Sequence, residues 1–263
     1  MIVDGRALAK EMLARTKVRA EKLLRKPNLL AYVAPDETPA TRSYLKTKAR
    51  SAEEAGCDFE ETRSLTFSSR ADAIIVQLPL PSELNTTDVL NSIPVTQDAD
   101  VLGSAARGKF EEGDADALLP PVVGAIREIF DRNNVKAKGK KTVVIGDGWL
   151  VGKPVAIWLT QQGADVTVLS IKTSTEDFAA ALCAADIIVS GAGSPHFIKP
   201  EMLKQDVILI DAGTSESGGA LAGDADPACA PKCSLFTPVP GGVGPLAVAC
   251  LFENVVTLVE RAQ

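Results

Sequence analysis

A β-branched run that leads directly into a glycine-rich turn is the feature that most constrains this chain. Residues 142–145 read Thr-Val-Val-Ile, residues 146–152 read Gly-Asp-Gly-Trp-Leu-Val-Gly, and a helical stretch then runs to Gln162. Glycines in a strand-to-helix turn let the backbone approach a pyrophosphate, whose charge the helix N-terminus attracts. The spacing G-x-G-x-x-x-G is one residue longer than the usual dinucleotide fingerprint. The sequence indicates a dinucleotide site, and a tight turn that needs glycine only for positive φ is the alternative.

The residues on both sides of this turn alternate between strand and helix patterns. Strands are predicted at 28–33, 73–76, 142–145, 165–169, 186–189 and 206–210. Helices are predicted at 6–26, 41–55, 122–134, 175–185 and 246–261. We expect a loop at 101–108, and the prolines and glycines of 238–245 argue against a helix or a central strand there. This alternation predicts an α/β fold in which crossover helices connect parallel strands, with a Rossmann-type unit after residue 141.

Composition excludes several classes of protein. Lys and Arg number 28 against 34 Asp and Glu, a net charge of −6, so we expect no nucleic-acid partner. No apolar run reaches the about 18 residues of a membrane span, and the N-terminus has no signal-peptide pattern. Five scattered cysteines are interpreted as reduced thiols of a cytoplasmic protein. No metal site is expected, because Cys229 and Cys233 have no second cysteine pair and the only histidine, His196, is interpreted as structural.

Five polar residues before the glycine turn are candidates for chemistry. Tyr44 and Lys48 lie one helical turn apart, so each can shift the pKa of the other, although a solvated helix face is the alternative. Gln77 ends an apolar strand, where open α/β sheets bind ligands, or it simply caps the strand. Asp98 and Asp100 precede the predicted loop, and their spacing alone favours an ordinary Asx turn.

Five motifs, taken in their order, resemble those of the bifunctional methylenetetrahydrofolate dehydrogenase/methenyltetrahydrofolate cyclohydrolase family. They are Tyr-Leu-Lys-Thr-Lys at 44–48, Val-Gln-Leu-Pro-Leu-Pro at 76–81, Ile-Pro followed by Asp-Ala-Asp within 93–100, the glycine turn within 139–154, and Pro-Val-Pro-Gly-Gly-Val-Gly-Pro at 238–245. The resemblance covers nearly the whole chain, and the last motif is its most specific part.

The resemblance implies two α/β domains and two reactions. Residues 1–118, completed by a C-terminal helix at 243–263, would form the folate-binding catalytic domain, and residues 119–242 the NAD(P)-binding Rossmann domain. The enzyme would oxidise 5,10-methylenetetrahydrofolate to the 5,10-methenyl cation with a nicotinamide cofactor. It would then hydrolyse that cation to 10-formyltetrahydrofolate. The family also implies a homodimer formed through the Rossmann domain.

The resemblance further implies a role for each matched residue. Lys48 would assist water attack and proton transfer, and Gln77 would hydrogen-bond to it. Tyr44 would stack on the p-aminobenzoate ring, and Asp100 would bind the pterin N–H groups. Further substrate contacts are expected from Leu78, Pro79, Pro240, Gly241 and Gly242. Cofactor contacts are expected from Gly146, Asp147, Gly148, Val151, Gly152, Lys153, Pro154, Ser170, Ile171, Lys172, Gly191 and Thr214.

Several positions depart from the family pattern. A helix that usually precedes the strand at 73–76 is missing, and only residues 66–70 remain there. Leu-Pro-Pro-Val at 119–122 replaces Pro-Cys-Thr-Pro, Asp-Ala-Asp-Val-Leu at 98–102 replaces Asp-Val-Asp-Gly-Phe, and Gly-Pro-Leu-Ala at 244–247 replaces Gly-Pro-Met-Thr. Two alternatives therefore remain: a catalytically impaired folate- or nucleotide-binding homologue, and a dehydrogenase of another pterin carrier.

We expect the cofactor to be NAD in preference to NADP. By the resemblance, members that use NADP carry Arg-Ser after the first glycine, where this chain has Asp147 and Gly148, and a further phosphate-binding serine aligns with Ile171. An anion there repels a 2′-phosphate and can accept hydrogen bonds from the ribose hydroxyls of NAD. Two features point the other way: Lys172 could meet a phosphate, and residues 169–172 lack the acidic residue usual after the second strand.

Overall fold

The computed structural model describes residues 1–66, 71–217 and 220–263, which fold into two compact units. The 122–247 unit comprises Met1–Leu8 and Val122–Ala247, and the 9–121 unit comprises Ala9–Pro121 and Val248–Gln263. Residues 1–8, which we expected in the folate domain, belong to the 122–247 unit. The reason is backbone pairing with a distant strand, which a helical pattern in the sequence does not predict. Ile2 forms a parallel bridge with Phe236, and the backbone N–H of Val3 donates to Phe236 O at 2.9 Å.

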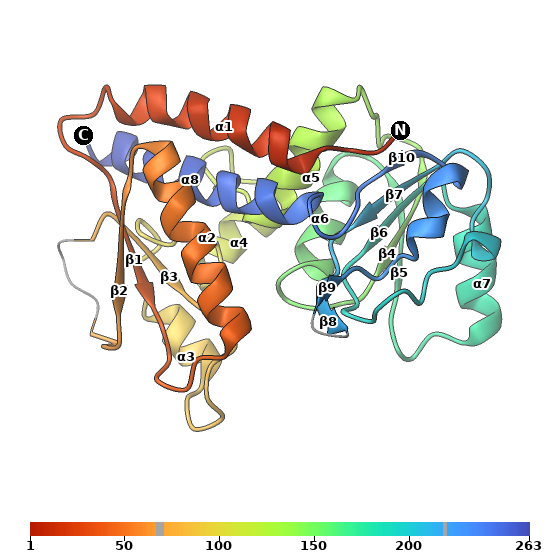
Figure 1. The fold of residues 1–263 in the computed structure, drawn as a ribbon, viewed down its shortest axis with the longest axis horizontal. Coiled ribbons are helices and arrows are strands. Elements are labelled where there is room, and N and C mark those ends of the chain that lie inside the picture. Colours follow the sequence, from red (N-terminus) through yellow and green to blue (C-terminus); the bar gives the residue numbers. More distant parts are fainter. Residues whose placement is uncertain (67–70, 218–219) are drawn as a thin grey trace. The chain divides into compact units, whose positions relative to one another are not determined.

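The 9–121 unit is built around a three-stranded parallel sheet of order β2-β1-β3 (Figure 1). Its strands are β1 (Asn28–Tyr32), β2 (Asp58–Thr62) and β3 (Ala73–Val76), and its helices include α2 (Pro39–Ala55), α3 (Thr86–Asn91) and α4 (Ser104–Glu112). Helix α2 forms between two local signals. Thr38 Oγ1 accepts a hydrogen bond from the N–H of Thr41 at its start, and Gly56, at φ 73°, ends it in the left-handed conformation. These elements confirm the predicted parallel α/β arrangement.

The 122–247 unit contains a five-stranded parallel sheet of order β10-β7-β6-β4-β5. Its strands are β4 (Lys141–Ile145), β5 (Asp165–Leu169), β6 (Ile187–Ser190), β7 (Val207–Asp211) and β10 (Cys233–Phe236). Its helices are α5 (Pro121–Arg132), α6 (Gly152–Gln161) and α7 (Thr175–Ala184). It also contains the 3₁₀ helices η1 (Pro200–Met202) and η2 (Pro227–Lys232), and an antiparallel pair of strands, β8 (Ser215–Ser217) and β9 (Ala220–Ala222). The chain leaves β4 toward β5 on one side and returns to β6 on the other. This reversal is the switch point at which doubly wound sheets bind ligands.

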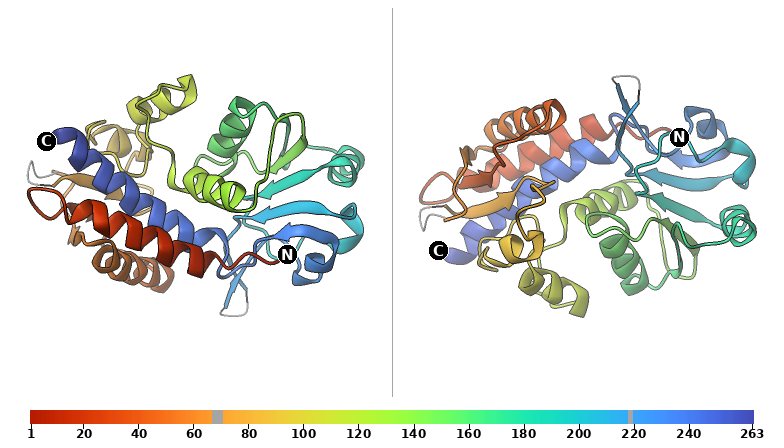
Figure 2. Two further views of the ribbon diagram at one scale, coloured as in Figure 1. Left: turned by 90° about the horizontal axis from the view of Figure 1, so that it is seen from above. Right: turned by 90° about the horizontal axis from the view of Figure 1, so that it is seen from below.

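Helices α1 (Gly5–Ala20) and α8 (Val243–Ala262) lie side by side in both views (Figures 1 and 2). Arg19 donates hydrogen bonds to Glu260 and Thr257, which ties the end of α1 to α8. Among the described residues, α8 alone has the length and composition of a membrane-spanning helix, but 61% of its most apolar window is buried. Such burial is typical of a core helix, and it makes length and composition weak evidence for a span.

Three expectations about elements were wrong. Helix α1 stops at Ala20 rather than continuing to residue 26, because Arg25 and Lys26 instead bind Asp72 and Asp58 beside the three-stranded sheet. The expected loop at 101–108 contains the start of α4. Helix α8 begins inside the segment 238–245, where a proline at the third helical position is tolerated because the first turn needs no backbone donor. Of the shortened segment 66–70, residues 67–70 lie outside the described part of the chain.

Candidate active site and dinucleotide site

Lys48 and Gln77 meet at the carboxyl edge of the three-stranded sheet. Helix α2 packs on the unit's core through Leu45, which is 1% exposed, and Lys48 lies three residues further along the same helix face. Lys48 Nζ donates a hydrogen bond to Gln77 Oε1 at 2.8 Å, and Gln77 Nε2 donates to Leu78 O at 3.0 Å. The second bond fixes which way the Gln77 amide faces, so its oxygen points at the lysine. Tyr44, one turn before Lys48, stays partly exposed to solvent.

Asp100 acts electrostatically on Lys48. Burial lowers the pKa of the Lys48 ammonium from its ordinary value, and attraction to Asp100 opposes that shift. Burial raises the pKa of the Asp100 carboxyl, opposed by attraction to Lys48 and to Arg107. Desolvation is the larger cause for both groups, so each is closer to its neutral form than in water. A lysine whose pKa is lowered and a carboxyl whose pKa is raised are both better suited than in water to exchange protons with a substrate.

Asp98 has a different role from Asp100. It is buried, and its carboxylate accepts hydrogen bonds from the backbone N–H groups of Leu102 (3.3 Å) and Gly103 (2.7 Å). Burial raises its pKa to about 6. These bonds shape the turn from which α4 starts. Asp98 thus forms the turn that the spacing suggested, whereas Asp100 interacts electrostatically with Lys48 and Arg107.

Sequence reasoning missed two residues of this site. Arg107 on α4 is 2% exposed, and burial lowers its pKa while Glu111, Asp98 and Asp100 attract it. Its spacing of four residues before Glu111 on a helix was the available signal. Asn254 on α8 donates from Nδ2 to Ala99 O and to Leu119 O, both at 2.9 Å. A polar residue on the apolar stripe of the last helix was the sign of that buried role.

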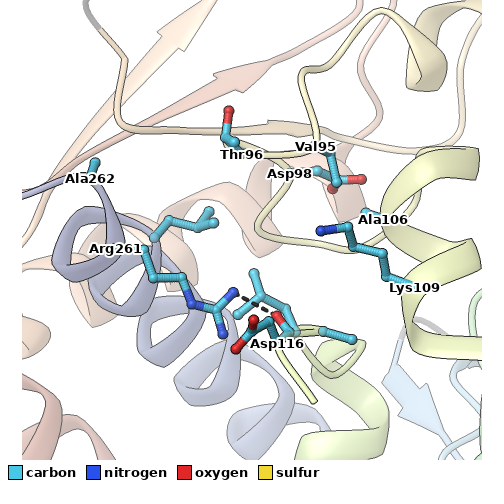
Figure 3. A pocket seen from close by; sticks show the side chains of 11 residues that line it. Val95, Thr96, Asp98, Ala106, Lys109, Asp116, Arg261 and Ala262 are labelled. Carbon is cyan, nitrogen blue, oxygen red and sulfur yellow. Dashed lines mark hydrogen bonds between the residues drawn. The ribbon is translucent and has the colours of Figure 1, made fainter. Parts of the chain in front are cut away.

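A pocket of about 360 Å³ lies beside Asp98 (Figure 3). Lys109 and Asp98 line it from α4 and the preceding turn, and Arg261 of α8 reaches in to donate a hydrogen bond to Asp116 O at 2.8 Å. Lys48, Gln77 and Tyr44 are not among the residues that line it. The pocket is therefore separate from the Lys48–Gln77 pair.

The glycine turn after β4 packs against the loop after β6. Gly146 has φ 97°, and a Cβ on it would lie 2.9 Å from Gly191 O. A Cβ on Gly152 would lie 1.9 Å from Gly146 O, and one on Gly191 would lie 2.4 Å from Val151 Cγ1. Only glycine fits at these three positions, because a side chain there would collide with neighbouring protein atoms, so the turn packs closely on the loop after β6 at the switch point. Gly148 has nothing within 4 Å of a built Cβ, so its own surroundings do not require glycine.

The start of α6 has fewer free donors than the sequence suggested. Helix α6 has no side-chain cap, but the N–H of Lys153 donates to Gly148 O at 3.0 Å and that of Val155 to Val151 O. Pro154 has no N–H. The turn itself is therefore a larger source of backbone donors than the helix end.

The remaining predicted cofactor residues lie at the same sheet edge. Asp147 sits exposed after β4, and Ile171 and Lys172 are exposed just after the neighbouring β5, where Ser170 is half-buried. Thr214 is exposed after β7. Lys153 Nζ lies 4.7 Å from the centroid of the Trp149 ring, a cation–π contact.

Pro240, Gly241 and Gly242 belong to the 122–247 unit, whereas Lys48, Gln77 and Asp100 belong to the 9–121 unit. Gly241 has φ 109°, and the N–H of Gly242 donates to Pro238 O at 2.7 Å. A Cβ on Gly5 would lie 1.9 Å from Gly242 O, so the start of α1 and this loop are in direct backbone contact.

No metal centre accompanies these sites in the part of the chain that the structure describes, since no group of three His, Cys, Asp or Glu could hold an ion. Cys233 Sγ instead donates to Cys229 O at 3.2 Å, and burial raises the pKa of Cys229 to about 12. Nδ1 of the His196 ring lies 3.3 Å from Ala225 O, and the backbone N–H of His196 donates to Gly223 O. All three side chains are used in packing loops.

Fold and site together define an α/β enzyme that pairs a dinucleotide-binding unit with a unit carrying a half-buried lysine. The family model for the tetrahydrofolate dehydrogenase/cyclohydrolase NAD(P)-binding domain matches residues 120–263. Bifunctional protein FolD of Aliarcobacter butzleri is 34% identical over 97% of this chain and 95% of its own length, and that of Thermotoga petrophila is 34% identical over 99% of each. The chain belongs to the tetrahydrofolate dehydrogenase/cyclohydrolase family.

Solved structures agree with this assignment. The FolD methylenetetrahydrofolate dehydrogenase/cyclohydrolase of Campylobacter jejuni has a TM-score of 0.94 and 29% identity, covering 100% of this chain and 99% of that one. The Trypanosoma brucei enzyme, solved with an NADP cofactor and an inhibitor, has a TM-score of 0.92 and 28% identity over 100% and 98%. The predicted family and the predicted α/β fold are confirmed.

Proposed function

We propose that this protein oxidises 5,10-methylenetetrahydrofolate to 5,10-methenyltetrahydrofolate with NAD or NADP, and hydrolyses the methenyl product to 10-formyltetrahydrofolate. The hydrogen bond of 2.8 Å between Lys48 Nζ and Gln77 Oε1 is the observation that carries this proposal. A protein that only bound folate or nucleotide would have no need of a desolvated lysine oriented by an amide. Its relatives from Aliarcobacter and Thermotoga, which match over almost their whole length, are named as bifunctional proteins.

The cyclohydrolase step follows from the state of Lys48. Because burial lowers its pKa, Lys48 gives up its proton more readily than a lysine in water, and the neutral amine can accept a proton from water attacking the methenyl carbon. Gln77 holds Nζ in place through its oxygen. Asp100 accepts hydrogen bonds from the pterin N–H edge, and Tyr44 provides an exposed ring for stacking on the p-aminobenzoate group.

The dehydrogenase step needs a nicotinamide dinucleotide, and the residues present fit one. The glycine-rich turn after β4 lies at the switch point of the parallel sheet, where doubly wound folds bind dinucleotides, and Gly148, with nothing within 4 Å of a built Cβ, leaves its backbone open to a pyrophosphate. When bound, the nicotinamide supplies the hydride acceptor. The side chains and backbone of residues 146–154, with the loops after β5, β6 and β7, hold and orient it.

We propose NAD as the preferred dinucleotide. Asp147 is exposed beside β5, where a negative charge repels a 2′-phosphate, and Ile171 offers no hydrogen bond to one. Exposed Lys172 is the opposing attraction, and the relative from Trypanosoma brucei was solved with NADP. Steady-state kinetics with both cofactors test the preference. A kcat/KM for NADP equal to or above that for NAD contradicts the role given to Asp147.

A homodimer in the cytoplasm completes the proposal. Strand β5 is an edge strand that pairs only with β4, and its Val168 is 44% exposed. An exposed apolar edge of a parallel sheet favours pairing with a second copy. Sedimentation velocity of the purified chain tests this, and a monomer at micromolar concentration contradicts it.

The decisive experiment compares Lys48→Gln with Lys46→Gln, an exposed lysine on the same helix. We expect Lys48→Gln to abolish hydrolysis of methenyltetrahydrofolate while dinucleotide binding is retained, because only the amine can take the proton. Lys46→Gln should keep both activities. Full hydrolysis above the uncatalysed rate by Lys48→Gln would overturn the assignment, and an inactive wild-type chain would favour the impaired homologue.

A further inference from the structure

Two buried aspartates lie beneath the loops that follow β6 and β7. Asp211 ends β7, Asp224 follows β9, and both are at most 1% exposed. Desolvation and, to a smaller extent, the nearby Asp224 raise the pKa of Asp211 to about 6. Buried carboxylates are costly unless they accept several hydrogen bonds. Both of these do, and all of their donors belong to loop backbone or loop-edge side chains.

Asp224 holds the loop after β6. Its Oδ2 accepts hydrogen bonds from Ser190 Oγ at 2.6 Å and from the N–H of Ala192 at 2.8 Å, and its Oδ1 accepts from the N–H of Ser194 at 2.8 Å. Residues 191–194 contain no helix or strand, so these bonds define the conformation of that loop. Gly191, which packs on Val151 of the glycine turn, lies within it.

Asp211 in turn holds Asp224. Its Oδ1 accepts from the N–H groups of Gly213 (3.0 Å) and Asp224 (3.2 Å), and its Oδ2 accepts from that of Ala225 (2.8 Å). The packing is reciprocal. A Cβ on Gly213 would lie 2.2 Å from the Asp224 carboxylate, and one on Gly223 would lie 2.1 Å from Asp211 Oδ2. The two aspartates therefore lock three separate chain segments into one arrangement.

We propose that Asp224 and Asp211 are positioning residues of the dinucleotide site, with Asp224 fixing residues 191–194 and Asp211 fixing Gly213 and the backbone of residues 224 and 225. This inference rests on the proposed function, since it assumes that a dinucleotide binds at the carboxyl edge of this sheet. Both loops follow strands at that edge, β6 at the switch point and β7 beside it. A loop that is already ordered loses less conformational freedom on binding, so the aspartates raise affinity without touching the ligand.

Asp224→Asn tests the inference with almost no change in side-chain volume. The amide replaces one acceptor oxygen with an NH₂ group, which must then face a backbone N–H or the Ser190 hydroxyl. We expect the KM and Kd for the dinucleotide to rise at least tenfold. Hydrolysis of methenyltetrahydrofolate needs no dinucleotide, and Lys48, Gln77 and Asp100 lie in the 9–121 unit, so its kcat/KM should stay within twofold.

Asp226→Asn is the matched control, because the same exchange two residues further on affects an ion pair with Lys199 at the surface. Both activities should stay within twofold in that variant. Ser190→Ala is a second test that removes one donor to Asp224 and keeps both oxygens, and it should raise the dinucleotide KM by a smaller factor.

Two results would overturn the inference while leaving the proposed function intact. One is an unchanged dinucleotide KM in both Asp224→Asn and Ser190→Ala. The other is a parallel fall of both activities with the folded fraction, which is the signature of a purely structural role. A wild-type chain that binds neither NAD nor NADP would instead overturn the proposed function, and this inference with it.

Discussion

Gly152 has no room for a side chain, so its replacement tests how closely the glycine turn is packed. A methyl group there would lie 1.9 Å from Gly146 O, which belongs to backbone that cannot rotate away. We expect Gly152→Ala to lower the free energy of unfolding by about 1–3 kcal/mol, the usual cost of overpacking. Gly148→Ala, which meets nothing within 4 Å, should change it by less than about 0.5 kcal/mol. Urea unfolding of both variants measures the difference, and equal stabilities would contradict the geometry of the turn.

Asp100 carries a second prediction at the scale of single residues. Asp100→Ala should weaken folate binding by roughly 1.5–3 kcal/mol, the worth of a hydrogen bond to a charged group, or about tenfold to hundredfold in affinity. Dinucleotide affinity should barely change, because Asp100 lies in the 9–121 unit. Titration calorimetry with each ligand checks both. Loss of dinucleotide binding with folate binding intact would contradict the role of Asp100.

Helix α8 is tied to the backbone of residues 99 and 119 by one side chain, that of Asn254. Asn254→Ala leaves Ala99 O and Leu119 O without their donor, at a cost of about 1–3 kcal/mol for unsatisfied buried groups. Glu253→Ala, one residue earlier, loses an ion pair with Arg19 near the surface and should cost at most about 1 kcal/mol. Urea unfolding compares the two variants. An equal or larger loss in Glu253→Ala would contradict a special role for Asn254.

The elements also show where local pattern is sufficient. Strand β3 covers the predicted residues 73–76, because a short run of apolar residues between polar segments is sufficient to indicate a buried strand. Helix α4 was not predicted, because its N-cap residue, Gly103, has no side chain that could cap the helix. The turn before α4 is ordered by Asp98, which is itself held in place by a parallel bridge with Ile74. That contact joins segments 24 residues apart, which no periodicity of neighbouring residues can report.

At the scale of the whole molecule, the buried carboxyls predict how stability depends on pH. Asp98 and Asp211 have pKa values of about 6 in the fold, against 3.8 when unperturbed. A raised folded pKa means that the folded state binds more protons, so the stability from each group is present below about pH 3.8 and is lost as pH rises through 6. The loss is on the order of 2–3 kcal/mol for each group.

Urea unfolding at pH 5.0 and pH 7.5 checks this window. As pH rises from 5.0 to 7.5, wild type should lose stability relative to Asp98→Asn, whose amide does not titrate. The same change is expected relative to Asp211→Asn. Asp88→Asn, on the exposed first turn of α3, is the matched control and should show no such change. A constant difference at both pH values would show that neither buried carboxyl titrates in this range.

The sequence by itself determined the family, the parallel α/β fold and the facing of Tyr44 and Lys48 along one helix. These rest on motifs and periodicities within a few residues of one another, which local sterics and burial impose on any chain that carries them. Tertiary structure alone decided that Lys48 donates a hydrogen bond to Gln77, that Asp98 accepts from the backbone of the turn before α4, and that Asp211 and Asp224 hold the loops beside the switch point. The reason is physical: a hydrogen bond or a desolvated charge depends on which distant segments meet, and sequence spacing does not encode that distance.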